Sequence, residues 1–219
     1  MIRPEVKFCG LTRPADAALA AELGARYVGV ILATGPRLLS ADRAREVLGA
    51  AHGPARVAVV GGGSPEALAG AGLKAGADIL QLHGDQEVDD IDRLRALWPG
   101  RLWVVIRIGA EGLPPDAVER ASHADAVLLD AKVAGRLGGT GQAFDWRAVT
   151  QDMAALRARA PIVLAGGLTP DNISEALDVL TPHVVDVSSG VESAPGIKDA
   201  ARMRAFMSVV TRWHPPSHA

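Results

Sequence analysis

The chain has 219 residues, of which 48% are hydrophobic, 22% charged and only 4% aromatic, and its formal net charge is −2. This composition is typical of a soluble globular protein with an aliphatic core, and the charge predicts neither nucleic-acid binding nor attachment to an anionic membrane surface. There is no segment like a signal peptide, no apolar run that could cross a bilayer, and only one cysteine, so we expect a cytoplasmic protein.

One pattern repeats eight times: a β-rich run, a loop that contains glycine, and an amphipathic segment rich in Ala, Leu, Arg and Glu. The predicted strands are Val6–Gly10, Tyr27–Leu32, Arg56–Val60, Ile79–His83, Leu102–Ile108, Ala126–Ala131, Ile162–Gly166 and Val184–Ser189. The predicted helices lie near Pro14–Leu23, Ala41–Ala51, Pro65–Ala75, Glu87–Leu97, Pro114–Ala121, Trp146–Arg159, Asp171–Leu180 and Ala200–Trp213. Ser40, Ser64 and Thr169-Pro170 mark helix starts, and Gly24 and Gly76 mark helix ends.

Strict alternation of strands and helices predicts parallel strands joined by right-handed crossovers. Eight such units favour an α/β fold of the TIM-barrel type, a single (β/α)8 domain over residues 1–213 followed by a flexible tail at 214–219. The alternative is an open doubly wound sheet. Against it, no glycine-rich dinucleotide motif follows the first strand, and Gly61-Gly62-Gly63 after the third strand lacks the required spacing.

In such a barrel the chemistry takes place at the carboxyl ends of the strands, where this sequence is unusually polar. Because side chains alternate along a strand, Lys7 and Cys9 are predicted to point into the barrel, and so are Asp130 and Asp186. Cys9 and Asp130 come from nearly opposite strands and both point toward the mouth. A small sugar would fit between them.

Glycine clusters follow the last strands and predict a phosphate site. Glycine lets the backbone approach an anion closely, and the loops after the seventh and eighth strands are the usual phosphate site of these barrels. The candidate residues are Gly166, Gly167, Ser189 and Gly190, together with Gly139 and Gly141 of the long loop after the sixth strand. We therefore expect a phosphorylated small-molecule substrate.

The motifs together resemble the phosphoribosylanthranilate isomerase family of tryptophan biosynthesis. The resemblance covers nearly the whole chain in order, through Lys7–Thr12, Pro36-Arg37, Gln81–Gly84, Leu129-Asp130, Gly138–Gly141, Phe144–Trp146, Leu164–Leu168, Asp171-Asn172, Asp186–Glu192 and Pro195–Asp199.

The resemblance implies an Amadori rearrangement of N-(5-phosphoribosyl)anthranilate to 1-(o-carboxyphenylamino)-1-deoxyribulose 5-phosphate, without metal or organic cofactor. It implies that Asp130 is the general acid that opens the sugar ring. Cys9 would be the general base that removes the proton from C2′, and Arg37 would bind the anthranilate carboxylate. The chemistry is plausible from the residues alone, because a 1,2-proton shift needs an acid and a base on opposite sides of the sugar.

Several roles stay open at this point. Cys9 needs help to become a thiolate, and Lys7 is one candidate, although a solvated or carboxylate-paired Lys7 is the alternative. Asp186 is expected to contact the substrate or to pair with Lys7 or Arg107. His83 is expected to contact the substrate or to hydrogen-bond a neighbour. Arg37 could instead be a surface arginine, and no grouping of His, Asp and Cys has metal-ligand spacing.

The chain departs from the family pattern in two loops, at Gly35 before Pro36-Arg37 and at Gly61-Gly62-Gly63. These changes are expected to affect KM more than the reaction. Two other functions compete with the isomerase. One is the related histidine-pathway isomerase, which uses paired aspartates where this first strand ends in cysteine. The other is a catalytically silent phosphosugar-binding subunit. We expect no nucleic-acid or membrane partner, and assembly as a monomer or homodimer.

Overall fold

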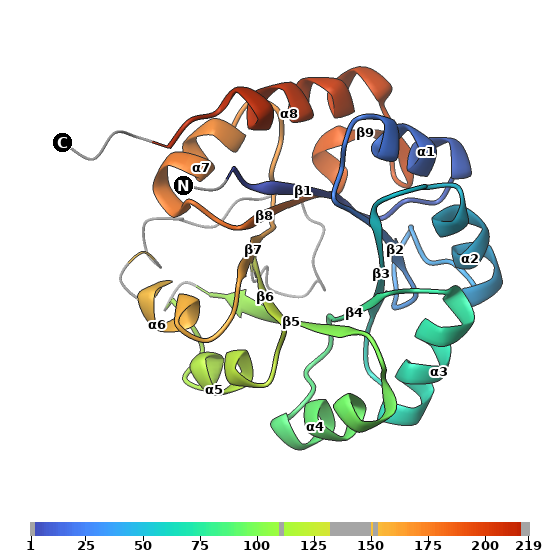
Figure 1. The fold of residues 1–219 in the computed structure, drawn as a ribbon, viewed down its shortest axis with the longest axis vertical. Helices are drawn as coiled ribbons and strands as arrows, with labels where there is room; N and C mark the ends of the chain where they lie inside the picture. The colour runs from blue at the N-terminus through green and yellow to red at the C-terminus, as the bar shows by residue number, and fades with distance from the viewer. Residues whose placement is uncertain (1–2, 110–111, 132–149, 151–152, 216–219) are drawn as a thin grey trace.

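The structure is a computed structural model that describes residues 3–109, 112–131, 150 and 153–215. Eight parallel strands close into one barrel in the order β1-β2-β3-β4-β5-β6-β7-β8, and the helices form a ring outside it (Figure 1). The predicted (β/α)8 barrel is therefore confirmed, and the open doubly wound sheet is excluded.

The strands of the barrel are β1 (Glu5–Phe8), β2 (Tyr27–Ile31), β3 (Ala55–Val60), β4 (Ile79–Leu82), β5 (Arg101–Ile108), β6 (Ala126–Ala131), β7 (Ile162–Leu164) and β8 (Val184–Val187). The helices are α1 (Pro14–Glu22), α2 (Ala41–Gly49), α3 (Pro65–Ala75), α4 (Val88–Leu97), α5 (Ala117–Ser122), α6 (Met153–Arg157), α7 (Ile173–Leu180) and α8 (Ala200–Arg212). A 3-10 helix, η2 (Ser189–Val191), and the short strands β9 (Glu192–Ala194) and β10 (Ile197–Lys198) lie between β8 and α8.

Helix boundaries follow the predicted caps in most places. Ser40 and Ser64 are N-caps whose hydroxyls accept backbone N–H bonds, and Gly76 closes α3 with a left-handed φ of 68°. The start predicted at Thr169-Pro170 is wrong, because α7 begins at Ile173. The Thr169 N–H donates to the side-chain oxygen of Asn172 at 2.8 Å, so this hydrogen bond holds residues 169–172 in a turn before the helix.

Two further helix predictions differ from the structure. The helix predicted from Pro114 begins at Ala117, because Pro115 disfavours a helical conformation for the residue before it. The helix predicted over Trp146–Arg159 is described only as α6, Met153–Arg157, and the first part of the predicted range lies outside the described residues.

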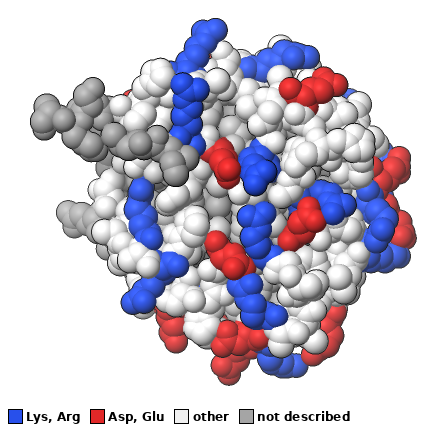
Figure 2. All heavy atoms as spheres, viewed as in Figure 1, with Lys and Arg blue, Asp and Glu red and all other residues white. Residues whose placement is uncertain are grey.

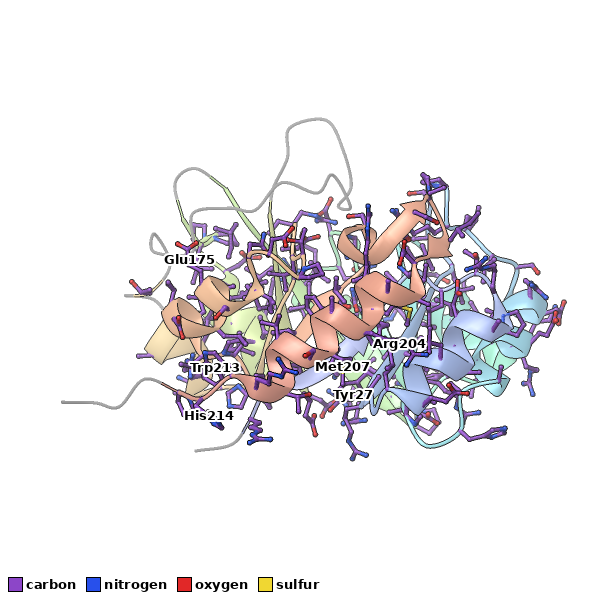
Figure 3. The ribbon with its side chains drawn as sticks, turned by 90° about the horizontal axis from the view of Figure 1, so that it is seen from above. Tyr27, Glu175, Arg204, Met207, Trp213 and His214 are labelled. Atoms are coloured by element: carbon purple, nitrogen blue, oxygen red, sulfur yellow. The ribbon has the colours of Figure 1, made fainter. Side chains whose placement is uncertain are left out.

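Alternation along the strands sorts the core into two layers, as predicted. Val6 and Phe8 face outward, and the Phe8 ring packs edge-on against Phe206 of α8 with centroids 6.3 Å apart. Tyr27 and Trp103 face inward and pack edge-on with centroids 4.9 Å apart. Tyr27 lies at the lower edge of the barrel in Figure 3, so this aromatic pair helps to fill that end of its interior.

The short hairpin of β9 and β10 was not predicted. Its two strands are antiparallel, and it is tied to the β1–α1 loop by a 2.5 Å bond from the Thr12 hydroxyl to the Gly196 carbonyl. The backbone N–H of Lys198 also donates to Asp16 of α1 at 3.2 Å. The hairpin therefore lies beside the carboxyl end of β1.

Lysine, arginine, aspartate and glutamate side chains are interspersed on the face shown in Figure 2. Ion pairs at the surface of the molecule include Arg56 with Asp78 at 2.8 Å and Arg95 with Asp125 at 2.6 Å. Among the described residues, no helix combines the length and apolar character needed to span a membrane.

Candidate active site

A cavity of about 930 Å³ opens at the carboxyl ends of the barrel strands. Eight of the side chains or glycines predicted for the site line it: Cys9, Arg37, His83, Asp130, Gly166, Gly167, Asp186 and Ser189. Both loops that depart from the family pattern line it as well, through Gly35 and Gly61-Gly62-Gly63. Gly139 and Gly141 lie outside the described residues. The polar strand ends noted in the sequence thus surround one cavity.

Cys9 follows β1 and is buried, with 6% of its surface exposed. Its backbone N–H donates to the Val187 carbonyl of β8 at 2.9 Å, which fixes the residue at the cavity wall. Burial raises the pKa of the Cys9 thiol above its usual range, and the nearby Lys7 ammonium opposes this shift without cancelling it. The site as it stands therefore holds a thiol that needs assistance to act as a base.

Lys7 is fully buried, and among the cations near this thiol it has the larger effect on the pKa of Cys9. Its Nζ donates to Asp186 at 2.7 Å and to the Gln81 side chain at 2.9 Å. Burial alone would lower the pKa of Lys7, but Asp186 and Cys9 raise it on balance, so the lysine stays charged. Of the partners foreseen for Asp186, the structure selects Lys7. Arg107 instead pairs with Asp85 at 2.6 Å.

Asp130 lies near the end of β6 and is buried, with 6% of its surface exposed. The nearest ring nitrogen of His83, Nε2, is 3.8 Å from an Asp130 carboxylate oxygen, too long for a hydrogen bond. Burial, with the charges of Arg107 and Lys7, lowers the pKa of His83 to about 4. His83 is therefore a neutral imidazole near pH 7, and its Nδ1 has no hydrogen-bond partner among the described residues.

Arg37 follows β2 and is buried, so the alternative of a surface arginine is wrong. Its Nε and Nη2 donate to the two carboxylate oxygens of Glu192 at 2.8 and 2.6 Å. Glu192 in turn accepts a bond from the buried Lys198 at 2.9 Å. Glu192 and Lys198 lie within two of the motifs shared with the family, but no role was predicted for either residue. Their ion pairs join segments far apart in the chain, and no local pattern reveals such a contact.

The loops predicted to bind phosphate follow β7 and β8, and at their glycines another residue would be strained or would have no room. Gly166 and Gly167 follow β7 with φ values of 87° and 67°, so two successive residues have the left-handed backbone that favours glycine. Ser189 opens the 3-10 helix after β8 and lines the cavity. Gly190 is packed closely against the Leu168 carbonyl, where a side chain has no room. The loops after β7 and β8 therefore lie together at one side of the cavity.

No group of three or more His, Cys, Asp or Glu side chains that could hold a metal ion occurs in the part of the chain that the structure describes.

Residues 6–209 match the sequence model of the N-(5'-phosphoribosyl)anthranilate (PRA) isomerase family. This chain belongs to that family. It is 42% identical over 212 residues to N-(5'-phosphoribosyl)anthranilate isomerase from Pseudomonas aeruginosa (strain LESB58), with 94% of each chain covered.

Solved structures of the family have the same fold. Phosphoribosyl anthranilate isomerase from Thermus thermophilus is 31% identical with a TM-score of 0.81, and the match covers 94% of this chain and 98% of that one. A phosphoribosyl anthranilate isomerase in complex with reduced 1-(o-carboxyphenylamino)-1-deoxyribulose 5-phosphate is 28% identical with a TM-score of 0.79, covering 95% and 98% of the two chains.

Proposed function

We propose that this chain catalyses the Amadori rearrangement of N-(5-phosphoribosyl)anthranilate to 1-(o-carboxyphenylamino)-1-deoxyribulose 5-phosphate, a step of tryptophan biosynthesis. The observation that carries the proposal is that Cys9 and Asp130 line one cavity with the glycine loops after β7 and β8. Cys9 follows β1 and Asp130 lies in β6, and two strands of the barrel, β8 and β7, lie between them. A phosphosugar held by those loops lies between the two groups.

Asp130 acts first, as the general acid. Its carboxyl group protonates the ring oxygen of the ribose, the C1′–O bond breaks, and the nitrogen lone pair completes a Schiff base at C1′. This carboxyl group is buried at the wall of the cavity, where it can reach the ring oxygen of a bound sugar. His83 stays neutral beside it, lines the same cavity and contacts the substrate there.

Cys9 acts second, as the general base that removes the proton from C2′. The electrons of that C–H bond move toward the protonated imine and give an enolamine, which tautomerises to the ketose. Because burial raises the pKa of Cys9, the thiolate depends on the Lys7 ammonium, held in place by Asp186 and Gln81. Asp186 uses one carboxylate oxygen for Lys7, while its other, buried oxygen has no hydrogen-bond partner among the described residues and is available to a sugar hydroxyl.

Binding is divided between two ends of the cavity. Arg37 holds the anthranilate carboxylate with the part of its guanidinium that Glu192 leaves unused. Backbone amides of the loops that contain Gly166, Gly167, Ser189 and Gly190 hold the phosphate, joined by Gly139 and Gly141 of the loop after β6. No step of this scheme calls for a metal or organic cofactor.

Complementation of a tryptophan auxotroph that lacks this isomerase tests the function in one step. Growth supports the isomerase, and failure with abundant folded protein contradicts it. A histidine auxotroph that lacks the related isomerase serves as the parallel strain, because Cys9 stands where that reaction uses an aspartate. A silent phosphosugar-binding subunit would rescue neither strain.

The biological setting is also part of the proposal. We expect residues 1–213 to fold as one domain with 214–219 as a tail, in a cytoplasmic enzyme that is a monomer or homodimer and binds neither nucleic acid nor membrane. Sedimentation equilibrium of the full chain measures the assembly directly. A truncation after residue 213 that melts at the same temperature supports the domain boundary.

A further inference from the structure

The guanidinium of Arg37 is held by a carboxylate that comes from the unpredicted hairpin. Glu192, the first residue of β9, accepts two roughly parallel charge-assisted bonds from Arg37, from Nε at 2.8 Å and from Nη2 at 2.6 Å. A two-point contact of this kind fixes the plane of the guanidinium, which a single bond does not.

The geometry leaves the other edge of the same guanidinium unused by Glu192. A guanidinium has five N–H donors, and Glu192 occupies the Nε donor and one of the two on Nη2. The edge between Nη1 and Nη2 still offers two parallel donors, which match the spacing of a second carboxylate. Because Arg37 lines the cavity, one guanidinium can join Glu192 to a ligand carboxylate.

Glu192 is itself firmly anchored. Lys198 of β10 is buried, and its Nζ donates to Glu192 at 2.9 Å and to the Ser188 carbonyl at 3.0 Å. Burial alone would raise the pKa of Glu192, but its bonds to Arg37 and the charge of Lys198 lower it on balance, so it remains a carboxylate. The bond to Ser188 connects this cluster to the loop that follows β8.

The Arg37 side chain lies directly across the end of β1. A Cβ atom placed on Gly10, whose φ is +66°, would stand 2.5 Å from Arg37 Cδ. Arg37 therefore passes over the residue next to Cys9 on its way from the β2–α2 loop to the hairpin. The position of the Arg37 side chain therefore depends on two contacts: Gly10 packs against its Cδ, and Glu192 binds its guanidinium.

We propose that Glu192 is a positioning residue that aims Arg37 at the carboxylate of the substrate. The proposal rests on the proposed function, since it assumes an anthranilate carboxylate at Arg37. Arg37, Lys198 and Glu192 together carry one net positive charge, which a ligand carboxylate neutralises. If Glu192 served only to neutralise charge, its removal would strengthen carboxylate binding. If it positions Arg37, its removal weakens that binding. The two explanations thus differ in the direction of the change in KM.

The test is steady-state kinetics of Glu192→Gln with N-(5-phosphoribosyl)anthranilate. We expect KM to rise about tenfold with kcat changed little, because one well-aligned charged contact is lost. Arg37→Ala should raise KM at least as much, and adding Glu192→Gln to it should raise KM no further, since the two residues act as one unit. With an aniline analogue of the substrate, which has no carboxylate, Glu192→Gln should leave KM unchanged.

Asp78→Asn is the matched control. Asp78 forms the same two-point contact with an arginine, Arg56, but is not among the residues that line the cavity. Its variant should keep the wild-type KM. Melting temperatures of all variants separate lost folding from lost binding. If Glu192→Gln does not fold, Glu192→Asp keeps the charge, withdraws the carboxylate from Arg37 and should still raise KM.

The outcomes separate the two proposals. An unchanged or lower KM in the Glu192 variants, with a raised KM in Arg37→Ala, would overturn the positioning role and leave the proposed function intact. An unchanged KM in Arg37→Ala would remove Arg37 from the substrate site and overturn the positioning role, whereas no turnover of this substrate by the folded wild-type enzyme would overturn the proposed function.

Discussion

Removing the charge of Lys7 tests how the buried thiol of Cys9 becomes a base. Lys7 is fully buried, and its ammonium is fixed by Asp186 at 2.7 Å and Gln81 at 2.9 Å. Lys7→Met keeps much of the length and volume of the side chain and removes only the charge and its hydrogen bonds. We expect the pKa of Cys9 to rise in this variant, since a nearby cation favours the thiolate.

The size of the shift follows from the geometry. Cys9 Sγ and Lys7 Nζ lie 3.2 and 3.4 Å from the position that a Cβ on Gly29 would take, so they are no farther apart than these two distances together. Two unit charges ~6 Å apart at an effective dielectric constant of ~20 interact by about 3 kcal/mol. An energy of this size changes the equilibrium between thiolate and thiol about a hundredfold. At a pH below the pKa of Cys9, the thiolate fraction should therefore fall about a hundredfold.

The single cysteine makes the assay direct, because alkylation by iodoacetamide reports on Cys9 alone. At pH 8 the alkylation rate of Lys7→Met should be about a hundredfold below that of the wild type. Lys7→Met/Asp186→Asn should recover part of the loss, because the Asp186 charge raises the pKa of Cys9. Equal alkylation rates in the wild type and in folded Lys7→Met would refute electrostatic assistance from Lys7.

Three further predictions concern the surroundings of the site. His83 has its pKa lowered to about 4, so the unfolded chain binds its proton more readily and the free energy of unfolding should fall as pH drops from 6.5 toward 4. Protonation of His83 should cost about 3 kcal/mol of the free energy of unfolding over this pH range, measured by urea unfolding. His83→Asn should lack this contribution. Gly10→Ala should raise KM, because its methyl group displaces Arg37, and a wild-type KM would contradict that packing. Phe8→Ala should lower the free energy of unfolding by about 3–5 kcal/mol in the same assay, because it empties a fully buried contact with Phe206. A loss below ~1 kcal/mol would contradict the description of that core.

Much of the barrel could be predicted from the sequence because its signals are local. Alternation along a strand fixes which side chains point inward, so Lys7 and Phe8 were assigned to opposite faces, as the structure has them. Ser40 and Ser64 predicted the starts of their helices correctly, because an N-cap serine bonds only to a backbone N–H in the first turn of its own helix. Thr169 failed as a helix start because its local bonds with Asn172 compete with the helix.

The partners within the site could be predicted only in part, because they depend on contacts between distant segments. The sequence predicted that Asp186 points into the barrel, but it did not show whether Lys7 or Arg107 is its ion-pair partner. In the closed barrel β1 pairs with β8, which brings Lys7 next to Asp186. Glu192 lies more than 150 residues from Arg37 in the sequence, and neither motif contains a signal that predicts their contact. The depressed pKa of His83 likewise follows from burial, which the sequence does not display.

In the proposed mechanism, the Cys9 sulfur and the Asp130 carboxyl group face one cavity and move the two protons of the reaction. The most direct measurement is the kcat of Cys9→Ser and of Asp130→Asn with N-(5-phosphoribosyl)anthranilate, alongside the melting temperature of each variant. We predict that both fold like the wild type and lose about 10²- to 10⁴-fold in kcat, the usual contribution of a positioned acid or base. A near-wild-type kcat in either variant would show that its proton is moved by a different group.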